Sequence, residues 1–252
     1  MRPILLLAFL ILISSSSLAQ PLSTAWFAGV GGGLAAHDNG AFSRRLKSYT
    51  PLRDNGEDYL YQTGDFATAG ITLNAGGAVL FGGSYVVGAS GEMVSYPVVH
   101  SINAPGNARD EYRLGGWGGG LDLGFAAVND AGMLVFPYLH LGYYGYGLDY
   151  TNNQGDSIPF FEGKPVPPGT TATYTGAAPR LGIGIGMVKL IGVDGAGSTG
   201  GFAIAARLTW GVMPSRPEWL EPDGTVVNNG GLTPAYNGVA LSVSIGGGGG
   251  SR

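Results

Sequence analysis

Few residues in this sequence could serve as a nucleophile, a base or a metal ligand, and one segment places several of them together. His100 and Ser101 lie shortly before Asp110 and Glu111. A serine, a histidine and an acid are the groups that a lipid hydrolase or an acyltransferase would need. Because neighbouring residues of an extended chain point to opposite sides, His100 and Ser101 would face apart. We therefore predict solvated loop residues here and no catalytic residue.

Metal and cofactor sites are not predicted either. The chain contains no cysteine, which excludes a thiolate metal site, a disulfide and a cysteine nucleophile. Its 3 histidines, His37, His100 and His140, lack the close spacing of zinc ligands. The Gly-x-Gly runs near Gly116 and Gly182 are not followed by a helical pattern, which a phosphate-binding loop requires.

The composition narrows the class of protein. Of 252 residues, 47 are glycine and 44% are hydrophobic, while 12% are charged against about 25% in an ordinary soluble domain. The formal net charge of −4 offers no basic surface to nucleic acid. A chain so poor in charge is suited to lipid surroundings.

The first residues have the pattern of an export signal. Arg2 precedes an apolar run over 4–13, and Ser17-Leu18-Ala19 is a small-x-small cleavage signature. The run is shorter than the roughly 20 residues that a spanning helix needs. We expect a signal peptide over 1–19 and a mature N-terminus at Gln20, with an uncleaved anchor helix as the alternative.

Beyond this signal, apolar residues recur at every second position, which is the period of a β-strand. Val239 to Ile245 show it best, where apolar residues alternate with alanine and serine. In the fourth segment the phase changes between Tyr112 and Leu121, which predicts a β-bulge near 116–120. Eight segments follow the pattern: 25–36, 67–81, 84–96, 111–125, 133–149, 173–190, 201–213 and 235–246.

The connections between these segments alternate in length. Those after the second, fourth and sixth segments are short, and those after the first, third, fifth and seventh are longer and rich in Pro, Asn and Asp. Short turns at one end and long loops at the other are typical of transmembrane barrels. The even number of segments puts both termini at the short-turn end, which would be the periplasmic side.

The two faces of the segments differ in size, which decides between a soluble barrel and a membrane barrel. Gly182, Gly184 and Gly186 opposite Ser242 and Ser244 would leave a soluble core nearly empty. The bulky apolar face is therefore expected to contact lipid, where backbone groups require a closed sheet. The sequence predicts an all-β fold, a closed antiparallel eight-stranded up-and-down transmembrane β-barrel over 20–246, with short periplasmic turns, long external loops and a Gly-rich tail at 247–252.

Aromatic residues recur near both ends of the predicted strands, which is typical of the two membrane interfaces. At the turn-side ends we expect Trp26, Phe81, Tyr85, Phe125, Phe136 and Phe202. The aromatic girdle expected at the loop-side ends consists of Tyr96, Tyr112, Tyr150, Tyr174, Trp210 and Tyr236.

The inward faces carry a small set of charged residues. We expect them to pair and fill the lumen, because an unpaired buried ion is costly; a small pore or gate is the alternative. Tyr138, Tyr144 and Tyr146 are expected nearby. The predicted lumen charge cluster is Glu92, Asp122, His140, Arg180 and Arg207.

The strand that runs Phe136-Pro137-Tyr138-Leu139-His140-Leu141-Gly142-Tyr143-Tyr144-Gly145-Tyr146 resembles the fifth strand of small bacterial outer-membrane barrels. The glycine-rich sixth segment and the alternation over 238–245 are similar, so the mature chain resembles the OmpA, OmpX and OmpW class. The resemblance implies insertion by the outer-membrane assembly machinery and an adhesion, structural or small-solute role. Such proteins usually end on an aromatic residue, whereas this sequence runs past Ile245 into glycines.

Three functional hypotheses stay open from the sequence. The first is a non-catalytic outer-membrane barrel with a structural or surface-interaction role. The second is a narrow channel for small solutes or hydrophobic ligands, favoured by space beside the inward glycines. The third is a lipid-modifying enzyme. The expected partners are outer-membrane lipid, lipopolysaccharide and the assembly machinery, with no nucleic acid and no cofactor.

Overall fold

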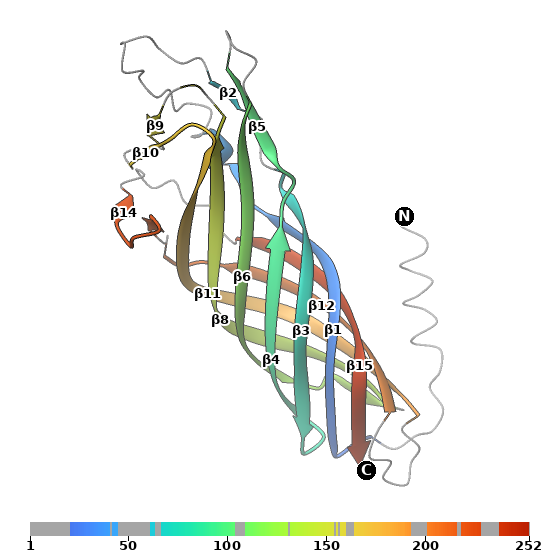
Figure 1. Ribbon diagram of the computed structural model, residues 1–252. Helices are drawn as coiled ribbons and strands as arrows, with labels where there is room; N and C mark the ends of the chain where they lie inside the picture. The colour runs from blue at the N-terminus through green and yellow to red at the C-terminus, as the bar shows by residue number, and fades with distance from the viewer. Residues whose placement is uncertain are drawn as a thin grey trace.

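Eight long strands form an antiparallel sheet that closes into a barrel, as predicted (Figure 1). The computed structural model describes residues 21–40, 42–44, 61–63, 67–103, 109–130, 132–153, 155, 157–159, 164–192, 201–215, 218–227 and 237–251, so the predicted signal peptide lies outside the described residues. The barrel strands are β1 (Thr24–His37), β3 (Ala69–Phe81), β4 (Tyr85–Ser95), β6 (Arg109–Phe125), β8 (Met133–Asn152), β11 (Thr170–Ile191), β12 (Gly201–Val212) and β15 (Gly238–Ser251).

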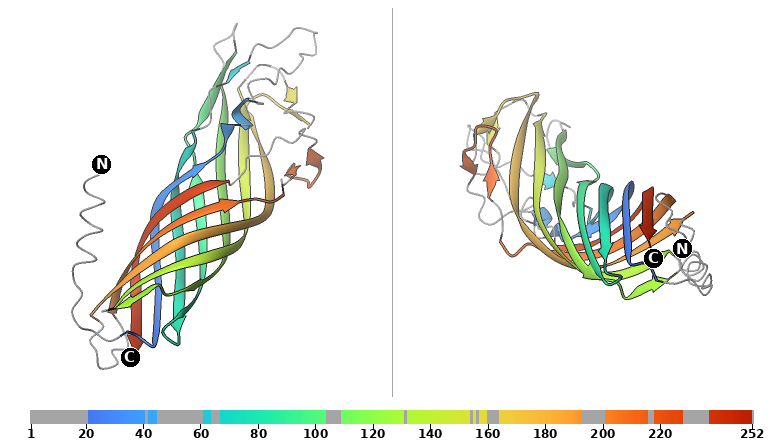
Figure 2. Two further views of the ribbon diagram at one scale, coloured as in Figure 1. Left: turned by 180° about the vertical axis from the view of Figure 1, so that it is seen from behind. Right: turned by 90° about the horizontal axis from the view of Figure 1, so that it is seen from below.

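The barrel closes between its first and last strands, because β15 pairs with β12 on one side and with β1 on the other. The strands are shifted relative to one another, so the barrel closes with a stagger. Paired residues followed from strand to strand around the barrel start at Trp26 in β1 and lead back to β1 at Ala36. Such a stagger goes with strands tilted by roughly 35–45° to the barrel axis, and Figure 2 shows the slant from behind. The path runs through Val79, Val87, Leu123, Leu139, Ile183, Trp210 and Val239.

One side of the barrel extends further at the loop end. The longest strands are β6, β8 and β11, with 17, 20 and 22 residues, and we call their loop-side ends the tall wall. The other strands among the described residues are short: β2 (Tyr61–Thr63), β5 (Val99–Asn103), β7 (Val128–Asp130), β9 (Ile158–Pro159), β10 (Pro165–Val166), β13 (Trp219–Leu220) and β14 (Val226–Val227). Of these, β5 pairs with β6 and β13 pairs with β11, so they extend the tall wall at its two edges.

The turn between β3 and β4 is made by the glycine pair that the sequence predicted. Gly82 and Gly83 have φ of 55° and 69°, a region that residues with a Cβ rarely adopt. The Ser84 amide donates a 3.1 Å hydrogen bond to the Phe81 carbonyl and closes the turn. This tight connection brings β3 and β4 together at the end opposite the long loops.

The predicted β-bulge at 116–120 is wrong. β6 pairs without interruption with both β4 and β8 through these residues. Tyr112 and Leu114 share the inward phase of Asp122 and are buried. The phase change in the sequence has a different origin: bulky residues line the inner face of the tall wall, whereas they line the outer face of the barrel below it.

The predicted boundary between barrel and tail also differs from the structure. β15 continues through the glycines to Ser251 and pairs with β1 over its whole length. A Cβ on Gly248 would lie 2.5 Å from Leu190 Cδ2, and one on Gly250 would lie 3.1 Å from Leu22 Cδ1. The glycines are therefore barrel residues that make room for side chains of their neighbours.

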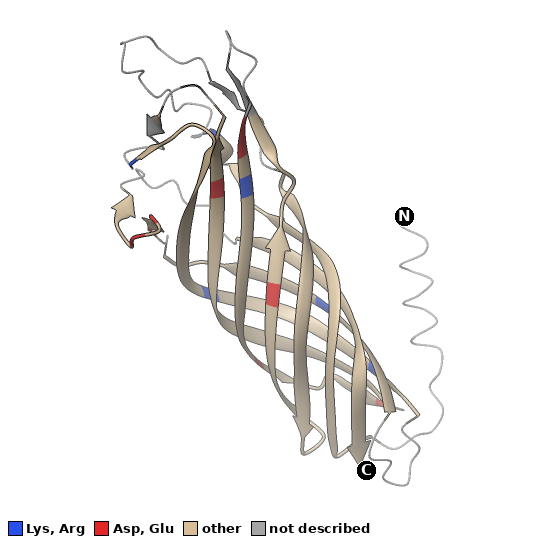
Figure 3. Ribbon diagram, in the orientation of Figure 1, with Lys and Arg blue, Asp and Glu red and all other residues tan. Residues whose placement is uncertain are grey.

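The outer face of the barrel is an apolar belt. Large hydrophobic side chains point outward at alternate positions, and charged positions are few along the strands (Figure 3). Among the described residues, no helix has the length and hydropathy needed to cross a membrane. Every barrel strand contributes exposed residues to the belt, for example Val30, Ile71, Met93, Leu121, Leu139, Ile183, Leu208 and Ile245.

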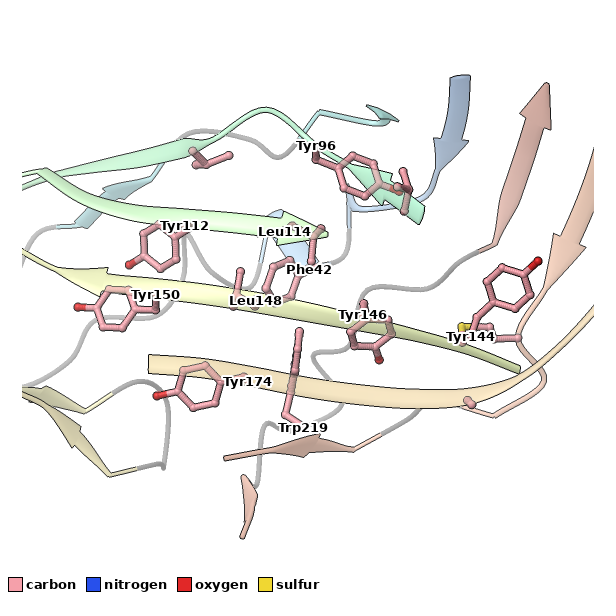
Figure 4. Packing of buried hydrophobic residues seen from close by; sticks show 14 of the residues in the cluster. Phe42, Tyr96, Tyr112, Leu114, Tyr144, Tyr146, Leu148, Tyr150, Tyr174 and Trp219 are labelled. Carbon is pink, nitrogen blue, oxygen red and sulfur yellow. The ribbon is translucent and has the colours of Figure 1, made fainter. Parts of the chain in front are cut away.

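The interior of the barrel has three layers. An apolar turn-side plug closes the end near the short turns, and a loop-side cluster lies against the inner face of the tall wall (Figure 4). A polar layer lies between them. The turn-side plug includes Leu22, Leu80, Val86, Leu134, Phe136, Val188 and Leu190. The loop-side cluster includes Phe42, Tyr96, Tyr112, Leu114, Tyr146, Leu148, Tyr150, Tyr174 and Trp219.

Candidate functional site

The structure brings together all five residues of the predicted lumen charge cluster, which we call the charged layer. Each comes from a different strand, and each side chain points inward because successive residues of a strand face opposite sides. The inward positions are the even-numbered ones in β4, β6, β8 and β11 and the odd-numbered ones in β12. The contributors are Glu92 (β4), Asp122 (β6), His140 (β8), Arg180 (β11) and Arg207 (β12).

Asp122 is the acceptor at the centre of the charged layer. Arg207 Nη2 lies 2.5 Å from its Oδ2, and His140 Nδ1 lies 2.8 Å from its Oδ1. On the other side of the imidazole ring, Nε2 is 3.0 Å from the Tyr144 hydroxyl. Both carboxylate oxygens and both imidazole nitrogens therefore have partners, as a buried polar network requires.

Arg180 forms the second ion pair of the layer. Its Nη1 is 3.2 Å from Glu92 Oε1, and its guanidinium lies 4.7 Å from the centre of the Tyr144 ring. Arg207 has a matching arrangement, 4.9 Å from the centre of the Tyr138 ring. Stacking on aromatic faces suits guanidinium groups that are removed from water.

Inward glycines lie beneath these aromatic and charged side chains. A Cβ on Gly118 would lie 2.2 Å from Tyr144 Cδ1, and one on Gly184 would lie 2.4 Å from Tyr138 Cζ. A Cβ on Gly211 would lie 2.4 Å from Arg180 Nε. The space beside these glycines is thus occupied by side chains from neighbouring strands.

A small cavity remains in the charged layer. Its volume is about 40 Å³, which is room for one or two water-sized groups. The polar residues that line it come from both the charged layer and the neighbouring strands: Asn74, Ser90, Glu92, His140, Tyr144, Arg180, Arg207, Thr209, Ser242 and Ser244.

Most of the predicted loop-side girdle does not face lipid. Tyr96, Tyr112, Tyr150 and Tyr174 are buried, because they lie on inward positions in the loop-side cluster. Trp210 is exposed on the outer face, and Tyr236 lies outside the described residues.

Two aromatic residues on the outer face were missed by the sequence reasoning. Trp117 and Tyr143 are exposed on the outer face of β6 and β8. Their shared phase with the outward Leu121 and Leu141 was the signal that could have identified them. At the turn-side end, Phe136 is buried in the plug, while the other five expected aromatics are exposed: Trp26, Phe81, Tyr85, Phe125 and Phe202.

His100 and Asp110, two of the residues considered for lipid chemistry, lie on opposite faces of the sheet. His100 is exposed on β5 and is paired with Glu111, which is half-buried. Asp110 points to the opposite, inner face and is fully buried. There it accepts hydrogen bonds from the Tyr150 hydroxyl at 3.2 Å and from the Asn153 amide at 2.8 Å. Asp110 is therefore part of the loop-side interior, whereas His100 is not.

An ionic contact joins two external segments outside the barrel strands. Lys164 Nζ is 3.3 Å from Glu221 Oε2 and also contacts Asp223, while the Lys164 amide donates a 2.7 Å hydrogen bond to Glu221 Oε1. The hydrogen bond from Lys164 holds the pKa of Asp223 well below its usual 3.8. The same hydrogen bond raises the pKa of Lys164 above 10.5.

Comparison with known proteins finds no matching family model and no matching curated protein. Among solved structures, the chain is similar to a major outer membrane protein of Thermus thermophilus, with 11% identity, 89% of this chain and 98% of that chain covered, and a TM-score of 0.43. It is similar to OprG of Pseudomonas aeruginosa, with 9% identity, 90% and 96% covered, and a TM-score of 0.33. The outer membrane protease OmpT of Escherichia coli gives 10% identity, 94% and 99% covered, and a TM-score of 0.41.

Proposed function

We propose that this chain is an integral outer-membrane β-barrel with a structural or surface-interaction role, and that it neither conducts solutes nor catalyses a reaction. The observation that carries the proposal is the combination of an apolar outer belt with a lumen that is filled at three levels. A wide channel would need a continuous water-filled path between the two ends.

The filled lumen argues against the channel hypothesis. An ion entering from the turn side meets the plug, where the space among Phe136, Leu134 and Leu190 is only about 10 Å³. Beyond the plug, it meets the paired arginines and acids of the charged layer. Desolvating an ion in such surroundings is costly. Several of the inward glycines, which had favoured a channel, lie beneath a ring or a guanidinium group, among them Gly184, Gly186 and Gly211.

The outer belt supports a location in lipid. Exposed hydrophobic patches of this extent are rare on soluble monomers, and a closed barrel satisfies its backbone groups without water. The proposed neighbours of the belt are outer-membrane lipid and lipopolysaccharide, and insertion is assigned to the outer-membrane assembly machinery. The tall wall and the external segments that pack on it would provide the surface for interactions.

Planar-bilayer recording tests the absence of conduction. We expect the purified barrel to give no discrete current steps at any applied voltage, while a general porin added to the same bilayer gives them. Reproducible steps from the wild-type chain that change in size when Arg180 is replaced by Gln would contradict the proposal and favour a narrow channel.

Mass analysis of membrane lipids tests the absence of catalysis. Lipids from cells with and without the chain are expected to be the same, because His100 and Asp110 lie on opposite faces of the sheet. A lipid species that appears with the wild-type chain and disappears with His100→Ala would overturn this part of the proposal.

A further inference from the structure

The cavity in the charged layer is lined by two residues that carry buried hydrogen-bond donors without partners, Arg180 and Asn74. Arg180 is 1% exposed, and its Nε and Nη2 have no hydrogen-bond partner among the described residues. Asn74 Nδ2, on the same cavity, has none either. Buried donors without acceptors cost free energy, and charged donors cost the most.

No carboxylate among the described residues lies within hydrogen-bond distance of these unpartnered donors. Asp122 already binds Arg207 and His140 through its two oxygens. Glu92, which also lines the cavity, lies opposite Asn74 in the pairing of β3 and β4, and its ion pair among the described residues is with Arg180 Nη1, at 3.2 Å. The Ser242 and Ser244 hydroxyls, which also line the cavity, can rotate to donate as well. A group that accepts hydrogen bonds without donating any would complete this arrangement.

We propose that the charged layer is a binding site for one monovalent anion of halide size, held by Arg180 and Asn74 with help from Ser242 and Ser244. A cavity of about 40 Å³ admits a chloride or bromide ion and excludes ions of many atoms such as gluconate. This site goes beyond the proposed structural role and does not depend on it.

The charge of the layer can accommodate such an anion. Glu92 and Asp122 balance Arg180 and Arg207, so an anion would enter a layer without formal net charge. The unpartnered donors of Arg180 and Asn74 would stabilise it there through hydrogen bonds.

Thermal unfolding in matched salts tests the site. The barrel is refolded in chloride, bromide or gluconate at equal ionic strength, and the unfolding midpoint is read from the heat-dependent shift in gel migration. We expect chloride and bromide to raise the midpoint by about 2–4 °C over gluconate. Asn74→Ala, which removes a neutral donor and leaves both ion pairs, is expected to reduce this difference. Glu92→Gln, which frees Arg180 Nη1, is expected to increase it.

The matched control is Arg113→Gln, an exposed arginine on the outer face of β6. Its response to the three anions is expected to equal that of the wild type. Equal midpoints in all three salts for the wild type would overturn the proposal, and the cavity would then hold only water. Loss of the response in Arg113→Gln would also overturn it, because the effect would then come from surface screening. In crystals soaked in bromide, an anomalous peak beside Arg180 is expected, and its absence would count equally against the site.

Discussion

At the residue scale, the interior is organised by glycines that face rings on neighbouring strands. Gly118 lies beneath Tyr144, and Gly184 lies beneath Tyr138. The alternation of the sequence was enough to place these residues on the inner face. It could not show that the rings lie across the glycines, because that depends on the stagger between strands, which no single segment encodes.

The fit of Tyr144 over Gly118 gives a stability prediction. Gly118→Ala would place a Cβ 2.2 Å from the ring and force it to move, at a cost of about 1–3 kcal/mol in the free energy of unfolding. Urea unfolding in detergent measures the change. The control is Gly91→Ala on β4, where the nearest atom would be at 3.5 Å, so that stability should be nearly unchanged. Equal effects of the two substitutions would show that the ring does not lie as described.

The external contact of Lys164 gives a pH prediction. Because the pKa of Asp223 is lowered in the folded chain, the contact is intact above the ordinary pKa of the carboxyl and is lost as the pH falls through the lowered value. We expect a carboxyl ¹³C titration of Asp223 to have its midpoint below 3.8. In Lys164→Gln the midpoint should move back toward 3.8. An unchanged midpoint in the variant would exclude Lys164 as the cause.

At the scale of elements, one asparagine side chain connects three segments at the turn-side end by hydrogen bonds. Asn129 in β7 accepts a 2.9 Å hydrogen bond from the Leu22 amide and donates to the carbonyls of Leu22 at 2.7 Å and Gly83 at 3.0 Å. The Gly83 amide donates to the Ser23 carbonyl at 2.7 Å. These bonds hold Leu22 in the turn-side plug, beside the turn between β3 and β4.

Asn129→Ala is therefore expected to loosen the turn-side end while the loop-side end stays intact. The loss of three hydrogen bonds should lower the free energy of unfolding by about 2 kcal/mol. Hydrogen exchange locates the effect: the Leu22 amide should exchange faster, while the Met213 amide, bonded to Asn237 at the loop side, should keep its rate. Faster exchange at both amides would indicate a general loss of stability instead.

The loop-side aromatics show where reasoning from single elements fails. Tyr112, Tyr150 and Tyr174 do lie near strand ends, as expected, but they face inward. The tall wall needs an apolar inner face because Phe42 and Trp219, from segments far apart in the sequence, pack against it. The inward orientation of these tyrosines depends on packing partners that are far apart in the sequence. The periodicity within a single strand contains no information about such partners.

At the scale of the whole molecule, the sequence was sufficient to predict the closed barrel, its strands and its charged residues inside. Bulky residues at every second position set the outer face, and glycine pairs such as Gly82-Gly83 set the tight turns. The pairings within the charged layer could not be predicted. Arg180 and Glu92 meet across the lumen from strands that are not neighbours, so their contact follows from closure itself.

The four tryptophans of the chain allow a direct test of which face meets lipid. Trp26, Trp117 and Trp210 are 45%, 55% and 50% exposed on the outer face, whereas Trp219 is 1% exposed inside. Single-tryptophan variants, with the other three replaced by Phe, are reconstituted into vesicles of phospholipids with brominated acyl chains, and fluorescence quenching is measured. The account predicts strong quenching of Trp26, Trp117 and Trp210 and little of Trp219. Quenching of Trp219 with the other three unaffected would mean that the faces of the barrel are reversed.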